Sequence, residues 1–164
     1  MKRFSFILLG VAMMLGFASC DLGEVLNPSG RFAVDIDGVA FEANILVAAV
    51  AKDSTTQTKI LTFTATSGGQ VVTLSMTEIG GDLGDDCLSV QEYTLANNQG
   101  AALGFTESGT AAGSATNVQA EVSACTLGDD NTVSGTFSGS LEDSNGNTIE
   151  FTNGVIEDVV FTVL

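Results

Sequence analysis

The sequence contains no histidine and no tryptophan, and its 164 residues include one proline, one tyrosine and three cysteines. Without histidine, a cysteine nucleophile has no imidazole beside it to form the thiolate. An enzyme built on this chain would therefore depend on carboxylates, serines or Tyr93. The lack of tryptophan also removes the aromatic platform that sugar-processing clefts normally use. These absences favour a noncatalytic protein.

Basic residues are also scarce, with five lysines and arginines against 20 aspartates and glutamates, and the formal net charge is −15. After residue 19 the chain keeps all 20 acids but only three bases, a formal charge of −17. Such a field repels nucleic acid and anionic lipid, so we expect no nucleic-acid partner. Because 45% of the residues are hydrophobic, the acidity indicates a solvated surface on a packed fold, not disorder.

No charge interrupts the mostly apolar run from Phe4 to Phe17, which follows Lys2 and Arg3. The run has the length of a secretory h-region and is short of the roughly 20 residues of a membrane-spanning helix. It ends in Phe17-Ala18-Ser19-Cys20, which resembles a lipobox except that leucine usually stands at the first position. We predict a lipoprotein signal peptide over residues 1–19 and lipidation of Cys20. An ordinary buried cysteine and an uncleaved single-pass membrane protein are the alternatives.

The expected partner of this anchor is a membrane. Several acyl chains on Cys20, palmitate among them, each contribute about 0.8 kcal/mol per buried methylene. Residues 20–30, with Pro28, are expected to form a short tether. Asp21 resembles an inner-membrane retention signal of some Gram-negative bacteria, whereas Asp21 with Glu24 resembles a surface-export signal of Bacteroidota. We expect an outer-membrane lipoprotein, either periplasmic or surface-exposed.

The two cysteines that remain after the anchor, Cys87 and Cys125, form an even pair in an exported chain. Disulfides persist in such compartments, so we predict that these two residues are bonded. A closed loop of this length stabilises the fold by about 4 kcal/mol in the chain-entropy account.

The sequence from residue 31 to 164 is predicted to form a single β domain. It lacks a long helical period, and strand patterns alternate with turn signals at intervals of about ten residues. This pattern favours an antiparallel β-sandwich or barrel of about 8–10 strands. Asp37-Gly38 indicates a tight turn between strands at 31–36 and 39–50, and Ser67-Gly68-Gly69 indicates a second hairpin between residues 57–66 and 70–77.

The remaining chain is expected to alternate in the same way. Residues 80–86 are predicted to be an acidic glycine-rich loop, 108–116 a mobile connection, and 152–154 a turn. The strands predicted between these segments cover residues 90–95, 101–107, 118–124, 132–141, 148–151 and 155–164.

Two parts of the chain support a family resemblance. These are residues 32–41, reading FAVDIDGVAF, and residues 133–137, reading VSGTF, followed by Asn145-Gly146 and Thr152-Asn153-Gly154. They resemble small β-rich lipoproteins of Bacteroidota, which form families of unknown function. The resemblance covers nearly the whole predicted domain and implies a β fold and an envelope address. It implies no catalytic residues.

The predicted disulfide suggests one metal site. Bonding of Cys87 to Cys125 brings their Cα atoms within about 7 Å of each other. Two acidic loops adjoin these cysteines and would then share one rim. Calcium binds six to eight carboxylate and carbonyl oxygens, so this rim is a hypothetical Ca²⁺ site, and no cofactor is otherwise expected. Its candidate ligands are Asp82, Asp85, Asp86, Asp129 and Asp130.

The sequence thus favours a cell-envelope lipoprotein with a noncatalytic binding, adhesion or structural role. The alternative is a hydrolase that acts on an envelope or extracellular polymer through paired carboxylates. The ten phenylalanines fit a β core better than a binding face.

Overall fold

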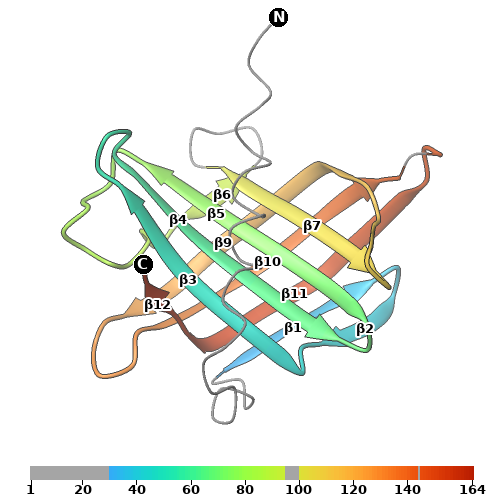
Figure 1. Ribbon diagram of the computed structural model, residues 1–164, viewed down its shortest axis with the longest axis horizontal. Helices are drawn as coiled ribbons and strands as arrows, with labels where there is room; N and C mark the ends of the chain where they lie inside the picture. Colours follow the sequence, from blue (N-terminus) through green and yellow to red (C-terminus); the bar gives the residue numbers. More distant parts are fainter. Residues whose placement is uncertain (1–29, 95–99, 144) are drawn as a thin grey trace, which may run out of the picture.

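The computed structural model of the protein describes residues 30–94, 100–143 and 145–164. The predicted signal peptide, Cys20 and all of the predicted tether except Gly30 lie outside these residues. The described residues form twelve strands in two six-stranded sheets, which pack face to face and whose strands cross one another (Figure 1). The predicted all-β fold class is confirmed, in its sandwich form.

We name the two sheets A and B. In spatial order, sheet A contains β2 (Val39–Glu42), β1 (Arg31–Ile36), β11 (Thr148–Val160), β10 (Thr132–Glu142), β9 (Ser114–Thr126) and β6 (Glu92–Thr94). In the same order, sheet B contains β12 (Thr162–Val163), β3 (Ile45–Asp53), β4 (Thr58–Ser67), β5 (Gln70–Ile79), β7 (Ala101–Glu107) and β8 (Thr110–Ala111). All neighbours are antiparallel except β12 and β3, which pair in parallel.

The alternation of apolar and polar residues explains why these segments form a sandwich. In β4, Leu61, Phe63 and Ala65 are buried, while the threonines between them face outward. Successive side chains of a strand point to opposite faces, so one face of each sheet is apolar and covers the other sheet. The predicted β4–β5 hairpin is confirmed, and Gly68 and Gly69 at its turn adopt positive φ angles of 57° and 85°.

The core lies between the two sheets and is rich in phenylalanine. The Phe32 ring lies 5.0 Å from that of Phe137 and 5.9 Å from that of Phe63, which belongs to the opposite sheet. Phe105 and Phe151 meet edge to face across the sheets at 5.7 Å. All seven phenylalanines of the described residues are buried. Their place in the core confirms the prediction made from composition.

Four predicted elements were wrong. The final strand at 155–164 ends at Val160, and Thr162 and Val163 form β12 in the other sheet. The strand at 39–50 is two strands, β2 and β3, which separate at Ala43 and Asn44 and belong to different sheets. The connection at 108–116 contains a turn, β8 and the start of β9. The turn at 152–154 lies within the continuous strand β11, where Asn153 has a φ of 55° and the register with β10 shifts. A β-bulge and a turn both favour asparagine at positive φ, so the local sequence did not distinguish them.

Short strands end both sheets. The edge strands β2, β6, β8 and β12 contain four, three, two and two residues. Short edges limit pairing with a strand of another molecule. Within the described ranges, no helix has the length and apolar character that crossing a membrane requires.

Candidate functional site

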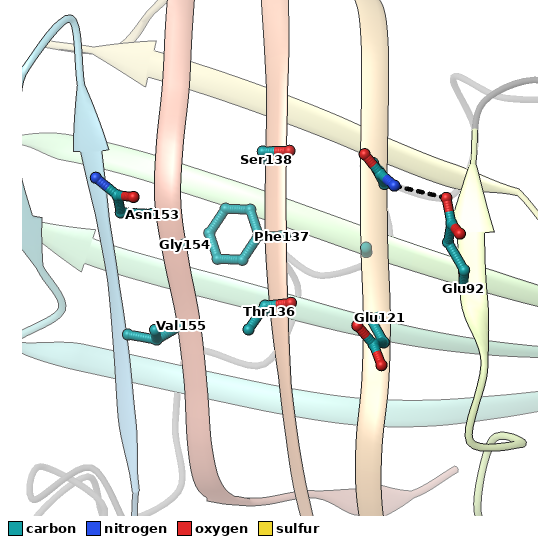
Figure 2. A pocket seen from close by; sticks show the side chains of 10 residues that line it. Glu92, Glu121, Thr136, Phe137, Ser138, Asn153, Gly154 and Val155 are labelled. Atoms are coloured by element: carbon teal, nitrogen blue, oxygen red, sulfur yellow. Dashed lines mark hydrogen bonds between the residues drawn. The ribbon is translucent and has the colours of Figure 1, made fainter.

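The outer face of sheet A carries an open groove of about 610 Å³, which crosses four strands (Figure 2). Its floor is formed by β10 and its sides by the longer side chains of β6, β9 and β11. The residues that line it are Glu92, Gln119, Ala120, Glu121, Thr136, Phe137, Ser138, Asn153, Gly154 and Val155.

The groove is deepest along β10 because the outward residues of that strand have short side chains. Thr136 and Ser138 face outward with short side chains, while Gly135, Phe137 and Gly139 face the core. Glu121 pairs in register with Thr136, and Gln119 pairs with Ser138. Because short hydroxyl side chains alternate with longer ones from strand to strand, the face is hollow along β10.

A close approach of β10 and β11 fixes this floor. Gly154 pairs with Phe137, and a Cβ atom at Gly154 would lie 2.4 Å from the Phe137 carbonyl oxygen. It would also lie 2.6 Å from the Phe137 ring. The ring therefore occupies the space that a side chain at position 154 would take, which explains the requirement for glycine there.

Two bulges bend β11, and the first of them lies beside the groove. At the first, Asn153 Nδ2 donates to Asp35 Oδ2 at 2.9 Å, which ties β11 to β1. At the second, Asp158 has a φ of 48°, its backbone N–H donates to Ser134 Oγ at 2.9 Å, and Ser134 Oγ donates to Asp158 Oδ1 at 3.1 Å. Bulges bend a strand and increase its twist, so they set the curvature of this face.

The groove is acidic. Glu92 of β6 and Glu121 of β9 stand directly opposite each other in the register, and both are exposed. Gln119 Nε2 donates to Glu92 Oε1 at 2.7 Å. Like charges at directly opposed positions of a sheet repel each other. The groove thus presents two carboxylates whose repulsion a cationic ligand would relieve.

The structure pairs every cation that it describes with a carboxylate outside the groove. These ion pairs are Arg31 with Glu42 and Glu157, Lys52 with Asp86, and Lys59 with Glu78. Among the residues that line the groove there is no basic side chain to compensate Glu92 and Glu121. Its charge and its hydroxyl and amide groups suit a ligand that donates hydrogen bonds and carries positive charge.

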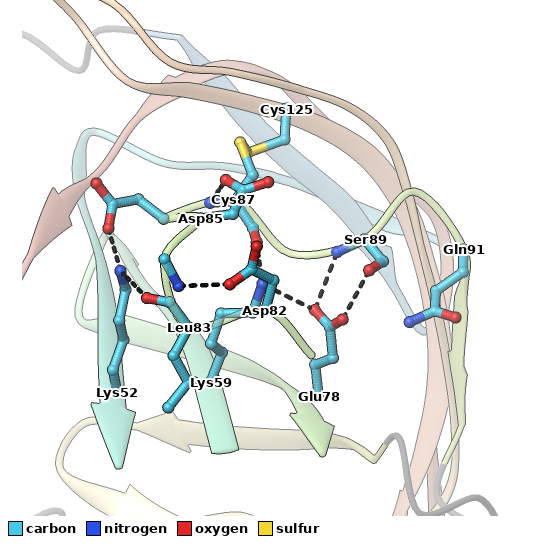
Figure 3. Close-up of polar contacts among 12 residues, drawn as sticks. Lys52, Lys59, Glu78, Asp82, Leu83, Asp85, Cys87, Ser89, Gln91 and Cys125 are labelled. Atoms are coloured by element: carbon cyan, nitrogen blue, oxygen red, sulfur yellow. Dashed lines mark hydrogen bonds and ion pairs between the residues drawn. A yellow bond between two sulfur atoms is a disulfide. The ribbon is translucent and has the colours of Figure 1, made fainter. Parts of the chain in front are cut away.

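A second polar cluster lies at one end of the sandwich, where residues 80–91 cover sheet B (Figure 3). Lys59 and Glu78 are 2% and 4% exposed, and Lys59 Nζ lies 3.4 Å from Glu78 Oε2. Glu78 accepts hydrogen bonds from Ser89 N at 3.0 Å and Ser89 Oγ at 2.6 Å. Lys59 also donates to the Cys87 carbonyl oxygen. The charged atoms of this pair therefore all have partners, and those partners fix the loop.

The electrostatics of Glu78 follow from these contacts. Burial by itself raises the pKa of the Glu78 carboxyl, but the hydrogen bonds from Ser89 and the charge of Lys59 outweigh it. The net shift of the Glu78 pKa is downward, so the carboxylate is stabilised in its ionised form. This buried pair stabilises the loop and leaves no free group for chemistry.

Tyr93 completes this end of the fold. Its ring is fully buried, and its hydroxyl donates to the Ser89 carbonyl oxygen at 2.8 Å. Burial raises the pKa of the Tyr93 phenol to about 12, and Glu78 contributes in the same direction against the hydrogen bond from Gln91. The neutral Tyr93 side chain therefore packs in the core and holds β6 in place, and β6 positions Glu92 in the groove.

The predicted disulfide between Cys87 and Cys125 is present, with its Cα atoms 5.8 Å apart. It joins the loop of residues 80–91 to β9 (Figure 3). Lys52, which donates to Leu83 O and pairs with Asp86, attaches the same loop to β3.

The five aspartates predicted to bind calcium do not form a site in the structure. Asp82 Oδ1 accepts from Gly84 N and Asp85 Oδ1 from Cys87 N, both at 2.8 Å, and Asp86 pairs with Lys52. Asp82 and Asp85 thus accept hydrogen bonds from backbone N–H groups of their own loop, while Asp86 is paired with a lysine of β3. Asp129 and Asp130 are exposed in the segment after β9. In the described part of the chain, no three histidine, cysteine or acidic side chains come together as metal ligands would.

The groove residues were missed by sequence reasoning. Glu92 and Glu121 are 29 positions apart, and the short strand β6 meets β9 only at residues 92–94. The available signal was the run of outward hydroxyl residues in β10 beside two glycines. It did not reveal which acidic side chains would lie next to it.

Comparison with known proteins places the chain in a family without assigning it an activity. A family model described as a domain of unknown function, DUF6252, matches residues 29–160. No curated protein and no solved structure matches the chain. The match includes the groove, the disulfide and every strand of both sheets except β12. The chain therefore belongs to the DUF6252 family of domains of unknown function.

Proposed function

We propose that this protein is a noncatalytic binding protein of the cell envelope. In this proposal the lipid on Cys20 attaches it to the outer membrane, and the groove of sheet A binds a cationic segment of a partner protein. The observation that carries the binding role is the directly opposed pair Glu92 and Glu121 in an open groove without a basic residue.

The anchor is supported by the sequence features before the described residues. The basic start, the apolar run from Phe4 to Phe17 and the small residues before Cys20 match a lipoprotein leader. The family match begins at residue 29, after all of them. The resemblance to small lipoproteins of Bacteroidota belongs to the same proposal. Mass spectrometry of the protein from cells should find an acylated Cys20, and a Cys20→Ala variant should lose both the lipid and the membrane fraction.

The side of the membrane is a separate question. Because Asp21 and Glu24 resemble a surface-export signal, we expect the domain on the outside of the outer membrane. Protease treatment of intact cells should remove it. Full protection of the domain in cells with an intact outer membrane would instead show that it lies in the periplasm.

The cationic ligand follows from the chemistry of the groove. An exposed ion pair contributes about 0.2–1 kcal/mol, and a charge-assisted hydrogen bond adds direction to it. Lysine or arginine side chains can reach both glutamates while their backbone lies over the short Thr136 and Ser138. The acidic surface as a whole attracts such a segment from a distance.

The same two carboxylates are the basis of the hydrolase alternative. Two-carboxylate hydrolysis of a glycoside requires one carboxyl kept protonated by its surroundings and one kept ionised. Glu92 and Glu121 are both exposed to solvent on one open sheet face. This arrangement favours binding over catalysis.

The test uses the full chain in mild detergent and a lysine-rich peptide of ten residues. We expect the Glu92→Gln/Glu121→Gln double variant to bind the peptide about tenfold more weakly, from two exposed pairs at roughly 0.7 kcal/mol each. The control double variant Glu107→Gln/Glu142→Gln removes the same charge outside the groove and should bind like the unaltered chain. Equal weakening in both variants would show that net charge alone binds the peptide.

A further inference from the structure

One row of side chains crosses the groove from an acidic end to an aliphatic end. The register places Glu92 of β6, Glu121 of β9, Thr136 of β10 and Val155 of β11 beside one another on the outer face of sheet A. Both glutamates are exposed, and Val155 is partly buried. The row therefore presents two carboxylates, then a short hydroxyl side chain, then an aliphatic surface. Figure 2 shows these four side chains in the groove.

This order of groups suits a long side chain with a cationic end and an apolar stem. Arginine and lysine lay their methylene stems along apolar surface while the charged end reaches polar partners. Neighbouring strands lie about 4.8 Å apart, so the point midway between Glu92 and Glu121 is roughly 12 Å from Val155. A long side chain covers most of this distance, with its backbone beside β11. A bare metal ion would use only the acidic end of the row.

The carboxylate of Glu92 is held in one orientation by its neighbour. Gln119 Nε2 donates to Glu92 Oε1 at 2.7 Å across the pair of strands β6 and β9. The amide of Gln119 is neutral, so it orients the carboxylate without cancelling its charge. Within the described ranges, no other side chain donates to Glu92 or to the Glu121 carboxylate. The remaining oxygens of both groups are therefore available to a ligand.

We propose that the groove selects arginine over lysine, because one guanidinium group bridges Glu92 and Glu121. This inference rests on the proposed function, in which the groove binds a cationic segment. Directly opposed residues of an antiparallel pair have Cβ atoms about 4.5–5.5 Å apart, so one planar group fits between the two carboxylates. The guanidinium carries five N–H donors in a fixed fork and donates to both, whereas the lysine ammonium is a compact, strongly hydrated point charge. Gln119 is a positioning residue in this arrangement.

The probes are three peptides that differ at one position. The first is the lysine-rich peptide of ten residues, and in the second one central lysine is changed to arginine. The third has citrulline there, which keeps the shape of arginine without its charge. A hydrogen bond to a charged group corresponds to about a tenfold change in binding. Calorimetric titration of the full chain in mild detergent, at about 0.05 M salt, should therefore find the arginine peptide about tenfold tighter than the lysine peptide. The citrulline peptide should bind no more tightly than the lysine peptide.

Two variants test the bridge and its positioning. Glu121→Gln removes one side of the bridge, so the two affinities should become nearly equal. Gln119→Leu keeps the net charge, so binding of the lysine peptide should not change. The arginine peptide should bind this variant about threefold more weakly, since the released Glu92 side chain must be ordered on binding. The matched control is Gln70→Leu, because Gln70 Nε2 donates to Glu107 Oε1 at 3.1 Å in the same kind of cross-strand pair on sheet B. It should change neither affinity.

The ratio of the two affinities decides the proposal, because a general loss of folding weakens both peptides together. An arginine preference that Glu121→Gln abolishes, Gln119→Leu reduces and Gln70→Leu leaves unchanged supports it. Circular dichroism checks folding, and Gln119→Ala replaces Gln119→Leu if the leucine variant does not fold. A preference that Gln119→Leu leaves unchanged overturns the positioning role of Gln119.

Two other results separate this proposal from the proposed function. Equal binding of the arginine and lysine peptides, both weakened in Glu92→Gln/Glu121→Gln, overturns the arginine preference and leaves the groove as a binding site for cations. If neither peptide is weakened in that double variant, the groove is not their site, and the proposed function fails together with this inference.

Discussion

The buried pair of Lys59 and Glu78 allows a quantitative test of how the loop of residues 80–91 is fixed. Replacing Lys59 with methionine keeps most of its volume but leaves the Glu78 carboxylate buried, with only Ser89 as its partner. Loss of one member of a buried pair typically costs about 3–5 kcal/mol, because the other charge remains desolvated. We expect Lys59→Met to lower the free energy of unfolding by about 4 kcal/mol at pH 7.

The pH dependence of this loss has a definite sign. The folded-state pKa of Glu78 lies below its ordinary value of 4.5. Its stabilisation is therefore present above pH 4.5 and is lost as the pH falls through the folded-state value. Below that value Glu78 is protonated in both proteins, so the difference between Lys59→Met and the unaltered chain should shrink at acid pH.

The assay is urea unfolding followed by circular dichroism at pH 7 and pH 3. Lys52→Met is the matched control, since its pair with Asp86 is more exposed, at 21% and 37% of the two side chains. A more exposed pair is expected to contribute about 1 kcal/mol or less. Equal losses from the two substitutions, or a loss at Lys59 that does not change with pH, would refute the argument.

Three further predictions concern other parts of the fold. Gly154→Ala should lower the free energy of unfolding by about 3 kcal/mol or more, because its Cβ would lie 2.4 Å from a carbonyl oxygen of β10 and overpack the core. The control Gly104→Ala meets no atom nearer than 3.8 Å and should change the free energy of unfolding by less than about 1 kcal/mol. Thermal unfolding measures both. Reduction of Cys87–Cys125, whose members are 38 positions apart, should lower stability by about 4 kcal/mol in urea unfolding. Because Tyr93 is the only tyrosine and tryptophan is absent, absorbance at 295 nm should show its phenolate near pH 12 in the folded protein and near pH 10 in urea. The stabilisation from its burial should be complete below pH 10 and lost as the pH approaches 12.

Local patterns predicted much of the fold. Positive φ angles at Asp37 and Gly38 match the predicted turn, and the strand predicted at 101–107 coincides with β7. Alternation of apolar residues indicated which side chains of β4 and β5 face the core. These features depend on neighbouring residues, whose steric and solvation preferences are local.

The features that the sequence did not reveal depend on pairing between residues that are far apart in the chain. Asn44 N donates to Thr66 O where the chain leaves sheet A for sheet B, and no residue near position 44 signals that change. Glu92 and Glu121 become neighbours only because β6 is the last strand of sheet A. The calcium prediction placed loop aspartates together from the disulfide, but Asp82 and Asp85 hydrogen-bond within their own loop. Such local hydrogen bonds compete with a shared metal site.

Mapping the lysine-rich peptide on the full chain by nuclear magnetic resonance tests the central claim most directly. Backbone amide shifts should change at β6, β9 and β10, around Glu92, Glu121 and Thr136, and change little on sheet B. Shifts spread evenly over the acidic surface, or confined to the loops at the ends of the sandwich, would contradict a binding role for the groove.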